Sequence, residues 1–595
     1  DGLSGSGCQF INTGTAVLVV GSVDDASGSA ITFDLSGNPL NVTDNSSATV
    51  PSLGAADLAL IGRQISIAGD VEASQLQVVA DSGSATYDTA TGDISTTSAA
   101  GGSSLEFAID SSALGGIYAD RITIVANESG TGVRARGDMA ALGDAITITA
   151  DGKLVVESVA LEAKTIDLVS ANSTVELVDV NATATGEAGV GSGGDISVTA
   201  AGAVTLENGS LRVTQSADNN GGLLQITAAS LTDTSTGSAT RSAEGQATIN
   251  VTGTAAIGSA TFDVGSLDLD ASRVELRADG SINAAALADL DVSTAQLDGT
   301  LLAADVDLDA SDAVSQSLGG ELTATNDLSF NANSFVSAGS LISDRNLSIA
   351  ASSLTQHGSG KYVVGGNLTL SGDTLDLSGR LRVDGLTTVA GFTQLTQNAD
   401  SHWTSQLGVS ATGASASLAG QINQTGTLNV DLSGALTVAT TAEIETAGTA
   451  GISLLVDGLL TNHGVVQSAG TLTVGNGTAG SALTNTGTLE AADAVSIDVA
   501  DLVFNKAVLD STDGNSADGR NLGKLYSGGT LAGANTIEDA LTVIGDQVGR
   551  IESFGGDVVV SAANVVNEGQ ITAAGALDFS NSVVRSQLAG IWNGT

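Results

Sequence analysis

Pairs of apolar residues two positions apart recur along the chain. Between residues 144 and 226 they are Ile146/Ile148, Leu154/Val156, Val159/Leu161, Ile166/Leu168, Val175/Leu177, Ile196/Val198, Val204/Leu206, Leu211/Val213 and Leu224/Ile226. Alternation with period two is typical of strands with one buried face, and Gly, Asn, Asp, Ser and Ala separate the pairs instead of helix-length segments. The pattern predicts a coil of short strands.

A longer repeat near the C-terminal end indicates the length of one turn. Residues 461–474, 484–497 and 566–579 share the pattern N-x-G-x-φ-x-small-Ala-x-x-φ-x-φ, in which φ is apolar. The first two copies begin 23 residues apart, which is about one turn of a solenoid. We therefore expect an all-β fold, an elongated parallel β-helix (β-solenoid) with about three short strands per turn.

The Asn and Gly residues of this repeat are candidate corner residues. They are Asn462, Gly464, Asn485, Gly487, Asn567 and Gly569. Two interpretations stay open: the Asn side chains stack into an amide ladder inside the corner, as identical side chains do in stacked sheets, or Asn-x-Gly only marks turns. Gly and Asn at corners are expected to supply positive φ.

Composition fits this architecture and narrows the function. Apolar residues make up 42% of the 595 residues but aromatic residues only 3%, so the core is built from small aliphatic side chains. There are only 2 Pro, which fits a fold of strand ladders because proline removes a ladder hydrogen bond. The net charge of −47 excludes ordinary nucleic-acid binding, because phosphate contacts require clustered Lys and Arg. We find no run of about 18 apolar residues and expect no membrane-spanning helix.

Three stretches within the first 165 residues resemble a known family. They are residues 2–13 (GLSGSGCQFINT), residues 61–80, and residues 107–122 (FAIDSSALGGIYADRI) with Glu128 and the Gly-Val-Arg at 132–134. Together they resemble the secretion domain of two-partner-secretion exoproteins of the filamentous haemagglutinin family, which includes haemagglutinin-type adhesins and contact-dependent-inhibition exoproteins. The motif residues are Gly2, Leu3, Cys8, Phe10, Asn12, Ala113, Leu114, Gly115, Gly116 and Tyr118.

The resemblance implies how the chain is exported. It implies a secreted protein on the outer cell surface of a Gram-negative bacterium, with an outer-membrane β-barrel transporter as partner and a cell-surface or other surface ligand that the sequence does not identify. It also implies a division into part of a secretion domain (1–165), an irregular shaft (166–450) and a more regular shaft (451–595). Gly5 stands where the family has the first Cys of C-x-x-C, so Cys8 lacks the partner that the family has. The chain starts inside the family's N-terminal motif, and we therefore expect it to be a segment of a larger protein.

The residues that usually carry chemistry give few candidates. His357, His402 and His463 are scattered without metal-ligand spacing, and Cys8 is expected to be a buried structural thiol. The His402-Trp403 pair is expected to form a surface bulge. We expect no catalytic, cofactor-binding or metal-binding residues.

Two weaker surface motifs complete the candidates. Alternating aspartates at 268–270 and 305–309 are expected to form a solvated outward face, and calcium is a weak possibility there. Arg136, Gly137 and Asp138 spell a tripeptide found in many integrin ligands, which makes them a weak adhesion motif.

The predicted function is a filamentous adhesin shaft that attaches to cells or surfaces. A toxin-delivery stick for contact-dependent growth inhibition is the alternative, because both use the same kind of shaft. A structural extracellular filament or matrix protein is a further alternative. A polysaccharide-cleaving β-helix enzyme is disfavoured, because the chain has only two Trp, at 403 and 592, and few, scattered basic residues.

Overall fold

The computed structural model describes residues 2–6, 8–10, 13–26, 28–35, 37–43, 53–99, 105–111, 115–186, 194–214, 222–235, 239–505, 549–586 and 591–593. The chain divides into two compact units, Asp1–Ala310 (unit 1) and Ser311–Thr595 (unit 2). Every regular element in the described residues is a strand, and none of these residues belongs to a helix that could span a membrane. The predicted all-β class is confirmed, whereas the three-part division of the chain stays a prediction.

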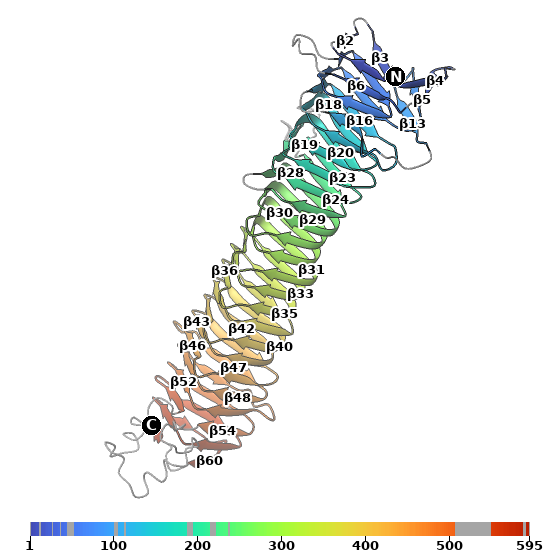
Figure 1. Ribbon diagram of the computed structural model, residues 1–595. Coiled ribbons are helices and arrows are strands. Elements are labelled where there is room, and N and C mark those ends of the chain that lie inside the picture. Colours follow the sequence, from blue (N-terminus) through green and yellow to red (C-terminus); the bar gives the residue numbers. More distant parts are fainter. Residues whose placement is uncertain are drawn as a thin grey trace, which may run out of the picture. The chain divides into compact units, whose positions relative to one another are not determined.

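Unit 1 is a parallel β-solenoid with three strand ladders, one on each side of the coil (Figure 1). The first ladder contains β3 (Thr15–Val19), β8 (Asp57–Gly62), β11 (Gln75–Ala80), β16 (Arg121–Ala126), β18 (Met139–Ala150), β20 (Ala160–Ser170), β23 (Asp195–Ala200), β26 (Leu223–Ala228) and β28 (Thr240–Ile257). The second contains β1 (Leu3–Gly5), β6 (Pro39–Val42), β9 (Gln64–Ile67), β14 (Phe107–Ser111), β17 (Gly132–Ala135), β19 (Leu154–Glu157), β21 (Val175–Val178), β24 (Ala203–Glu207) and β27 (Ser230–Asp233). The third contains β2 (Cys8–Gln9), β7 (Leu53–Gly54), β10 (Val71–Glu72), β15 (Ile117–Ala119), β22 (Asn181–Thr185) and β25 (Ser210–Thr214), together with the first residues of β18, β20 and β28. Three strands per turn are therefore confirmed.

Inward side chains stack in register from turn to turn. Ile122, Ile146, Ile166 and Ile196 are successive partners on the first ladder, and all four are fully buried. β-branched side chains suit this half-buried pleated surface. The steps between these partners are 24, 20 and 30 residues, so the turns of unit 1 differ in length while the stacked core does not.

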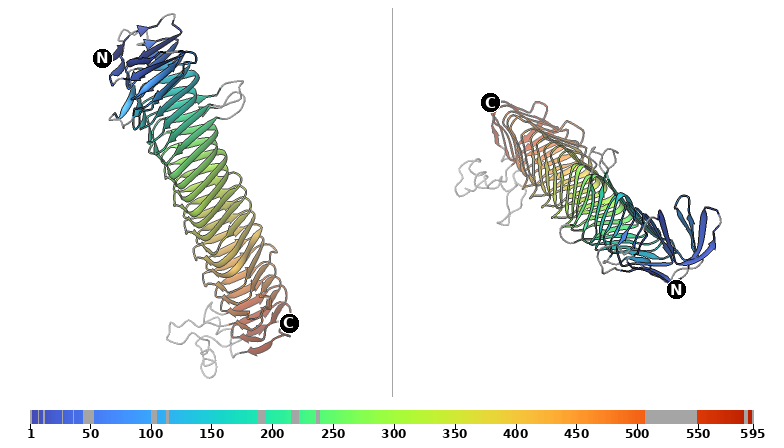
Figure 2. Two further views of the ribbon diagram at one scale, coloured as in Figure 1. Left: turned by 90° about the vertical axis from the view of Figure 1, so that its right-hand side faces the viewer. Right: turned by 90° about the horizontal axis from the view of Figure 1, so that it is seen from above.

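A separate antiparallel sheet in unit 1 was not predicted from the repeat pattern. It has the order β13-β12-β5-β4 and consists of β4 (Gly21–Asp25), β5 (Ala30–Leu35), β12 (Ser84–Asp88) and β13 (Ile94–Thr97) (Figures 1 and 2). Ala85 of this sheet packs with Ala59 and Ile61 of β8. β8 is therefore buried on both faces, which explains its continuous apolar run at residues 58–61.

Unit 2 is also a parallel solenoid with three ladders, and its turns are more uniform apart from one long turn between the partners Val495 and Val558. The first ladder contains β33 (Leu328–Ser337), β35 (Leu347–Gln356), β37 (Leu368–Ser371), β40 (Leu386–Gln397), β42 (Gly408–Leu418), β44 (Thr427–Leu432), β47 (Ile452–Val456), β50 (Leu472–Val474), β53 (Val495–Asp498), β56 (Val558–Ser561) and β59 (Leu577–Asp578). The second contains the last residues of β33, β35, β40 and β42 with β38 (Thr374–Leu377), β45 (Leu436–Val438), β48 (Leu459–Asn462), β51 (Ala482–Asn485), β54 (Leu502–Asn505), β57 (Asn564–Asn567) and β60 (Val583–Ser586). The third contains β32 (Glu321–Ala324), β34 (Ser340–Ser343), β36 (Lys361–Val364), β39 (Arg380–Val383), β41 (His402–Ser405), β43 (Gln421–Gln424), β46 (Glu443–Thr446), β49 (Val465–Ser468), β52 (Thr488–Ala491), β55 (Arg550–Ser553), β58 (Gln570–Ala573) and β61 (Ile591–Asn593). On the first ladder Leu328, Leu347 and Leu368 are partners at steps of 19 and 21 residues.

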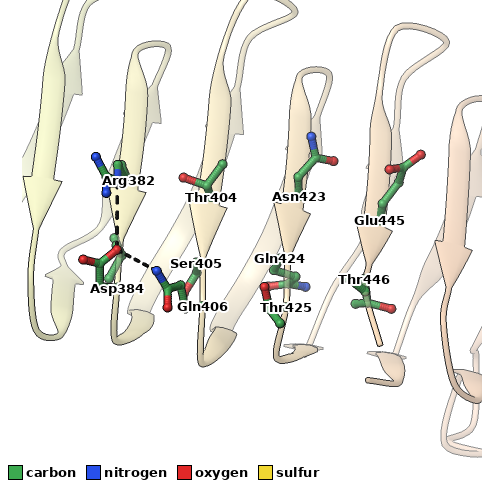
Figure 3. A pocket seen from close by; sticks show the side chains of 12 residues that line it. Arg382, Asp384, Thr404, Ser405, Gln406, Asn423, Gln424, Thr425, Glu445 and Thr446 are labelled. Atoms are coloured by element: carbon green, nitrogen blue, oxygen red, sulfur yellow. Dashed lines mark hydrogen bonds and ion pairs between the residues drawn. The ribbon is translucent and has the colours of Figure 1, made fainter. Parts of the chain in front are cut away.

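The third ladder of unit 2 carries a groove of about 320 Å³ on its outer side. It runs across β39, β41, β43 and β46, and its side chains lie in two rows that cross the strands (Figure 3). The predicted bulge at His402-Trp403 is wrong, because both residues lie in the regular strand β41 and Trp403 is buried beneath this surface.

Candidate functional site

The stretches that carry the family resemblance come together in unit 1 through a partly buried ion pair. Arg63, between β8 and β9, donates from Nη2 and Nε to the Glu128 carboxylate at 2.9 and 3.1 Å. The Glu128 side chain is only 2% exposed. The hydrogen bonds and the charge of Glu128 raise the pKa of Arg63, so the guanidinium stays charged. The pair joins residues that are 65 positions apart in the sequence.

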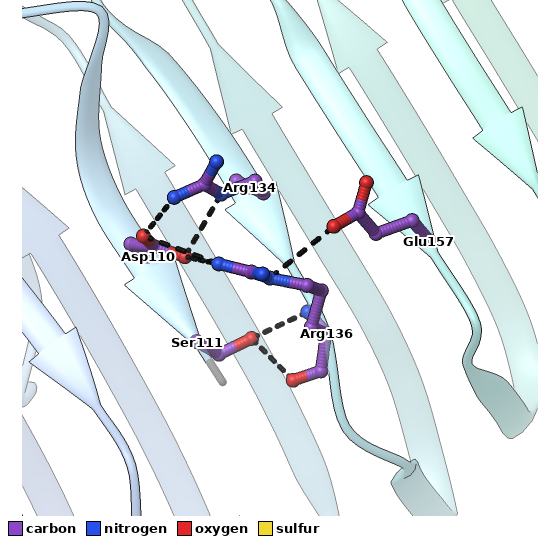
Figure 4. A network of polar contacts seen from close by, with 5 residues as sticks. All are labelled: Asp110, Ser111, Arg134, Arg136 and Glu157. Atoms are coloured by element: carbon purple, nitrogen blue, oxygen red, sulfur yellow. Dashed lines mark hydrogen bonds and ion pairs between the residues drawn. The ribbon is translucent and has the colours of Figure 1, made fainter. Parts of the chain in front are cut away.

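A second charged network lies on the outer side of β14, β17 and β19 (Figure 4). Arg134 and Arg136 both donate to the carboxylate of Asp110, with Arg136 Nη2 at 3.1 Å from Oδ1. Burial acts to raise the pKa of Asp110, but hydrogen bonds from the two guanidiniums outweigh it and hold that pKa below its ordinary value. Arg136 also pairs with Glu157 at 3.4 Å, and the Arg134 guanidinium lies 4.9 Å from the centre of the Phe107 ring. The network ties three successive turns together.

Of the two glycines of the Ala-Leu-Gly-Gly motif, Gly115 allows neighbouring turns to approach closely and Gly116 leaves room for the Tyr118 ring. A Cβ atom at Gly115 would lie 2.6 Å from the Gly69 carbonyl oxygen, and one at Gly116 would lie 2.5 Å from the Tyr118 ring. The Gly116 N–H donates to the Asp70 carboxylate at 2.8 Å. Tyr118 lies in β15 and exposes nearly half of its side chain. Ala113 and Leu114 lie outside the described residues.

The first motif stretch forms part of the first turn. Leu3 in β1 pairs with Leu40 and is partly exposed, and Gly2 has room only for hydrogen because a Cβ atom would lie 2.5 Å from the Pro39 carbonyl oxygen. Phe10 donates its N–H to the Gly54 carbonyl at 2.9 Å. Asn12 lies outside the described residues.

The prediction that Cys8 is a buried thiol is wrong. Cys8 is exposed, and its Sγ lies 3.8 Å from the Ser6 carbonyl oxygen. It lies in β2, a strand of two residues that pairs with β7. In the described residues β2 pairs with β7 alone, so no turn stacks on its other edge to cover the side chain.

The Arg-Gly-Asp tripeptide is tied into the coil by its side chains. Arg136 is held by Asp110 and Glu157, as described above, and the Asp138 carboxylate accepts the Ala160 N–H at 2.9 Å. Gly137 has φ of 97°, a conformation that favours glycine, and is buried. An attachment role for these residues stays a prediction.

The Asn residues of the C-terminal repeat form an amide ladder in one corner of unit 2. Asn462 Nδ2 donates to Asn485 Oδ1 at 2.9 Å, Asn485 donates to Asn505 at 2.9 Å, and Asn505 donates to Asn567 at 2.8 Å. All four side chains are fully buried. Each of the first three also donates to a backbone carbonyl, of Thr488, Arg550 and Gln570 respectively. Asn505 was missed because Lys-Ala follows it where the repeat has x-Gly.

The corner glycines do not have the positive φ that was expected of them. Gly464, Gly487 and Gly569 are absent from the described residues with positive φ. A Cβ atom at these positions would lie 2.4, 2.1 and 2.2 Å from the carbonyl oxygens of Ala439, Gly464 and Gly549. Glycine is therefore required there by the close stacking of turns.

The aspartates of the predicted solvated face stack in register. Asp268 pairs with Asp289 and Asp270 pairs with Asp291, between β29 (Thr261–Leu276) and β30 (Ser281–Leu297). Burial, followed by the charges of Asp291, Asp307 and Asp268, raises the pKa of Asp289. The described residues contain no group of three or more His, Cys, Asp or Glu side chains placed to hold a metal ion.

Comparison with known proteins assigns the N-terminal part of the chain. Residues 1–156 match the TPS secretion domain. The chain is 34% identical over 156 residues to tRNA nuclease CdiA-2 of Burkholderia pseudomallei (26% of this chain, 5% of that protein). It is 29% identical over 372 residues to 16S rRNA endonuclease CdiA of Enterobacter cloacae (60% and 10%), and 32% identical over 320 residues to Toxin CdiA of Escherichia coli (50% and 10%). No solved structure matches.

The matched region, residues 1–156, contains the ion pairs of Arg63 with Glu128 and of Arg134 with Asp110. The predicted two-partner-secretion exoprotein is confirmed by the domain match and by these relatives. Such exoproteins are secreted through the outer membrane with an outer-membrane transporter as partner. The chain spans a tenth or less of the length of the relatives named above.

Proposed function

We propose that the chain is the export domain and part of the shaft of a toxin-delivery exoprotein that acts on contact between cells. The observation that carries this proposal is the match to relatives named as CdiA toxins and nucleases, one of which extends over 372 residues and so reaches well beyond the secretion domain. These names favour the delivery alternative over the adhesin role predicted first. On this proposal the protein is held at the outer surface of a Gram-negative cell.

Export in this proposal is vectorial. The secretion domain engages the outer-membrane transporter, and each emerging turn adds to the edge of the turn before it. Parallel register between successive turns supports this, because a new turn then needs only the preceding turn as template. Unpaired strand edges are confined to the growing end, which limits aggregation during export.

Attachment to cells or surfaces is the second candidate. It is favoured by the polar groove on the third ladder of unit 2, which is described below. The absence of enzymatic activity in residues 1–595 and the absence of a cofactor stay predictions, as does the weak possibility of calcium on the aspartate face.

The export role is tested by two deletions of similar size. Removing residues 107–134 takes out the charged network and the Gly-Gly motif, and we expect it to abolish secretion when the chain is co-expressed with its transporter. The matched control removes residues 386–407. Leu386 and Gly408 are register partners, so this deletion removes one whole turn of unit 2 and leaves the stacking continuous. Immunoblots of culture medium measure export; normal export of the first variant would contradict the proposal.

The delivery role is tested by co-culture of producing and target cells. We expect cells that make the full-length exoprotein to inhibit target growth when the two are mixed, and not when a porous membrane separates them. Attachment without inhibition of any target strain would favour the adhesin role instead.

A further inference from the structure

The groove on the third ladder of unit 2 is built from polar side chains at equal spacing. Arg382, Thr404, Asn423 and Glu445 are successive register partners on β39, β41, β43 and β46, and all four point to the outer side of the coil (Figure 3). A second row at the strand ends contains Asp384, Gln406 and Thr425. Neighbouring strands are about 4.8 Å apart, so each row offers one polar group per 4.8 Å.

Asn423 of the first row and its neighbour Gln424 have hydrogen-bonding capacity that the protein leaves unused. Asn423 Oδ1 and both amide atoms of Gln424 are buried and have no hydrogen-bond partner. Gln424 follows Asn423 on β43, is 5% exposed and faces the inside of the coil directly beneath the groove. Buried polar atoms are nearly always paired, so unpaired ones beside a groove point to a ligand or to water that a ligand replaces.

The geometry excludes an extended peptide as the occupant. β41 pairs with β39 and with β43, and β43 pairs also with β46, so none of these strands offers a free backbone edge in the groove. The side chains in the two rows are polar; of the apolar residues that line the groove, Val383 is buried and Ala447 is small, so neither anchors a large peptide side chain. Strand addition and helix docking both require one of these features.

The charges exclude a polyanion. Arg382 is the only cationic side chain that lines the groove, and Asp384 and Glu445 are acidic. Arg382 also has Asp384 within 4.0 Å, which neutralises part of its charge. A nucleic acid or an acidic polysaccharide would therefore meet net negative charge.

We propose that this groove binds a linear, uncharged, hydroxyl-rich saccharide that lies across β39, β41, β43 and β46. The rise of one sugar unit along an extended chain is close to the spacing of neighbouring strands, so successive units meet equivalent polar groups. Amides and carboxylates can accept hydrogen bonds from vicinal hydroxyls, and amides can also donate to them. No aromatic platform is offered, because Trp403 is buried, so recognition rests on hydrogen bonds. The inference goes beyond export and holds for delivery and for attachment alike.

The test is binding of the purified chain to an array of linear hexasaccharides of three kinds: neutral (β-1,3-, β-1,4- and α-1,6-glucans), amino-sugar and uronic-acid. We expect binding to a neutral probe. In titration calorimetry with that probe, Asn423→Ala should weaken binding by about 5- to 10-fold, which corresponds to one or two neutral hydrogen bonds.

The matched control is Asn429→Ala. Asn429 is an exposed, outward residue of β44 on the first ladder, six residues further along the chain. We expect its substitution to leave saccharide binding unchanged, with thermal melts checking that both variants fold. Binding to uronic-acid probes alone, no binding to any probe, or equal effects of the two substitutions would each overturn the proposal.

Discussion

The two units bury polar side chains in different ways. Unit 1 uses oppositely charged pairs, Arg63 with Glu128 and Asp233 with Arg241, the latter only 0% and 1% exposed. In unit 2 neutral amides recur among the buried polar groups, in every second turn for the glutamines and in successive turns for the asparagines. Gln316, Gln356 and Gln397 donate to backbone carbonyls, and the Asn ladder follows further along the chain.

This difference corresponds to the difference in regularity. A buried charge pair needs two different residues in one fixed arrangement, so it defines one particular turn. An amide both donates and accepts, so the same residue can satisfy itself in turn after turn. Unit 1 contains residues 1–156, which match the TPS secretion domain, whereas unit 2 repeats one arrangement along the coil.

The largest effect is expected from removing one charge of the buried pair in unit 1. Asp233→Asn leaves the Arg241 guanidinium without its counter-charge, although Gly209 O and Ser235 Oγ still accept from it. Burial already lowers the pKa of Arg241 against the opposing effect of Asp233. Loss of one partner of a buried pair costs about 3–5 kcal/mol. Hydrogen exchange of β27 and β28 should report this loss locally.

The double variant Asp233→Leu/Arg241→Met sharpens the same test. Replacing both charges with apolar side chains removes the desolvation cost together with the attraction, so most of the stability should return. Equal hydrogen-exchange protection of β27 and β28 in the wild type and in Asp233→Asn would show that the pair does not stabilise these strands. The proposed difference between the two units would then be wrong.

Much of the coil could be predicted from local patterns. Period-two pairs such as Ile146/Ile148 and Ile166/Leu168 predict strands, and the 23-residue repeat predicts that Asn462 and Asn485 lie at equivalent positions of adjacent turns. The antiparallel sheet could not be predicted in this way, because its strands β5 and β12 are far apart in sequence and β4 is exposed throughout. The continuous apolar run of β8 was the available signal for its second buried face.

The charged contacts of unit 1 could not be predicted from spacing. Arg63 meets Glu128, and Asp110 meets Arg134 and Arg136, only because turns of unequal length place them in adjacent strands. The exposure of Cys8 depends likewise on the stacking of turns, because in the described residues β2 has a strand partner on one edge only. The residue types show which side chains could form ion pairs, but only the stacking of the turns shows which of them are neighbours.

A smaller effect is expected in the Asn ladder of unit 2. Asn485→Asp replaces the donating Nδ2 with an oxygen that faces Asn505 Oδ1 and the Arg550 carbonyl. We expect a loss of about 1–3 kcal/mol at neutral pH. Because these acceptors raise the pKa of the new carboxyl in the folded state, protonation should restore stability as pH falls. Denaturant melts between pH 4 and 7 measure this.

The ladder also predicts non-additive substitutions. Leu418 and Val438 precede Asn462 as register partners in the same corner, so the column accepts aliphatic side chains. Replacing all four Asn residues with Val should therefore cost less than four times the loss from Asn485→Val alone, because no amide is left unpaired. Strictly additive losses would show that the amides act independently and not as a ladder.

The smallest effect is expected on the outer surface, where the units also differ. Asp268 and Asp289 are stacked on the first ladder of unit 1, whereas the row Ser329, Ser348 and Thr369 on the first ladder of unit 2 is neutral. Asp289→Asn should stabilise unit 1 by a few tenths of a kcal/mol at low salt, since like charges opposite each other on a sheet are destabilising by about 0.2–1 kcal/mol.

Salt and pH distinguish this repulsion from a simple change of side chain. The folded-state pKa of Asp289 is raised, so the folded state binds its proton more tightly than the unfolded chain does. Above the folded-state pKa of Asp289 the wild type is therefore less stable than Asp289→Asn, and this difference in stability disappears as pH falls toward the unfolded-state pKa of about 3.9. Added salt should close it as well. The control Asp263→Asn, whose register partners Ser242 and Asn283 are neutral, should show no salt dependence in thermal melts. Equal behaviour of the two variants would assign the effect to the amide and not to stacked charge.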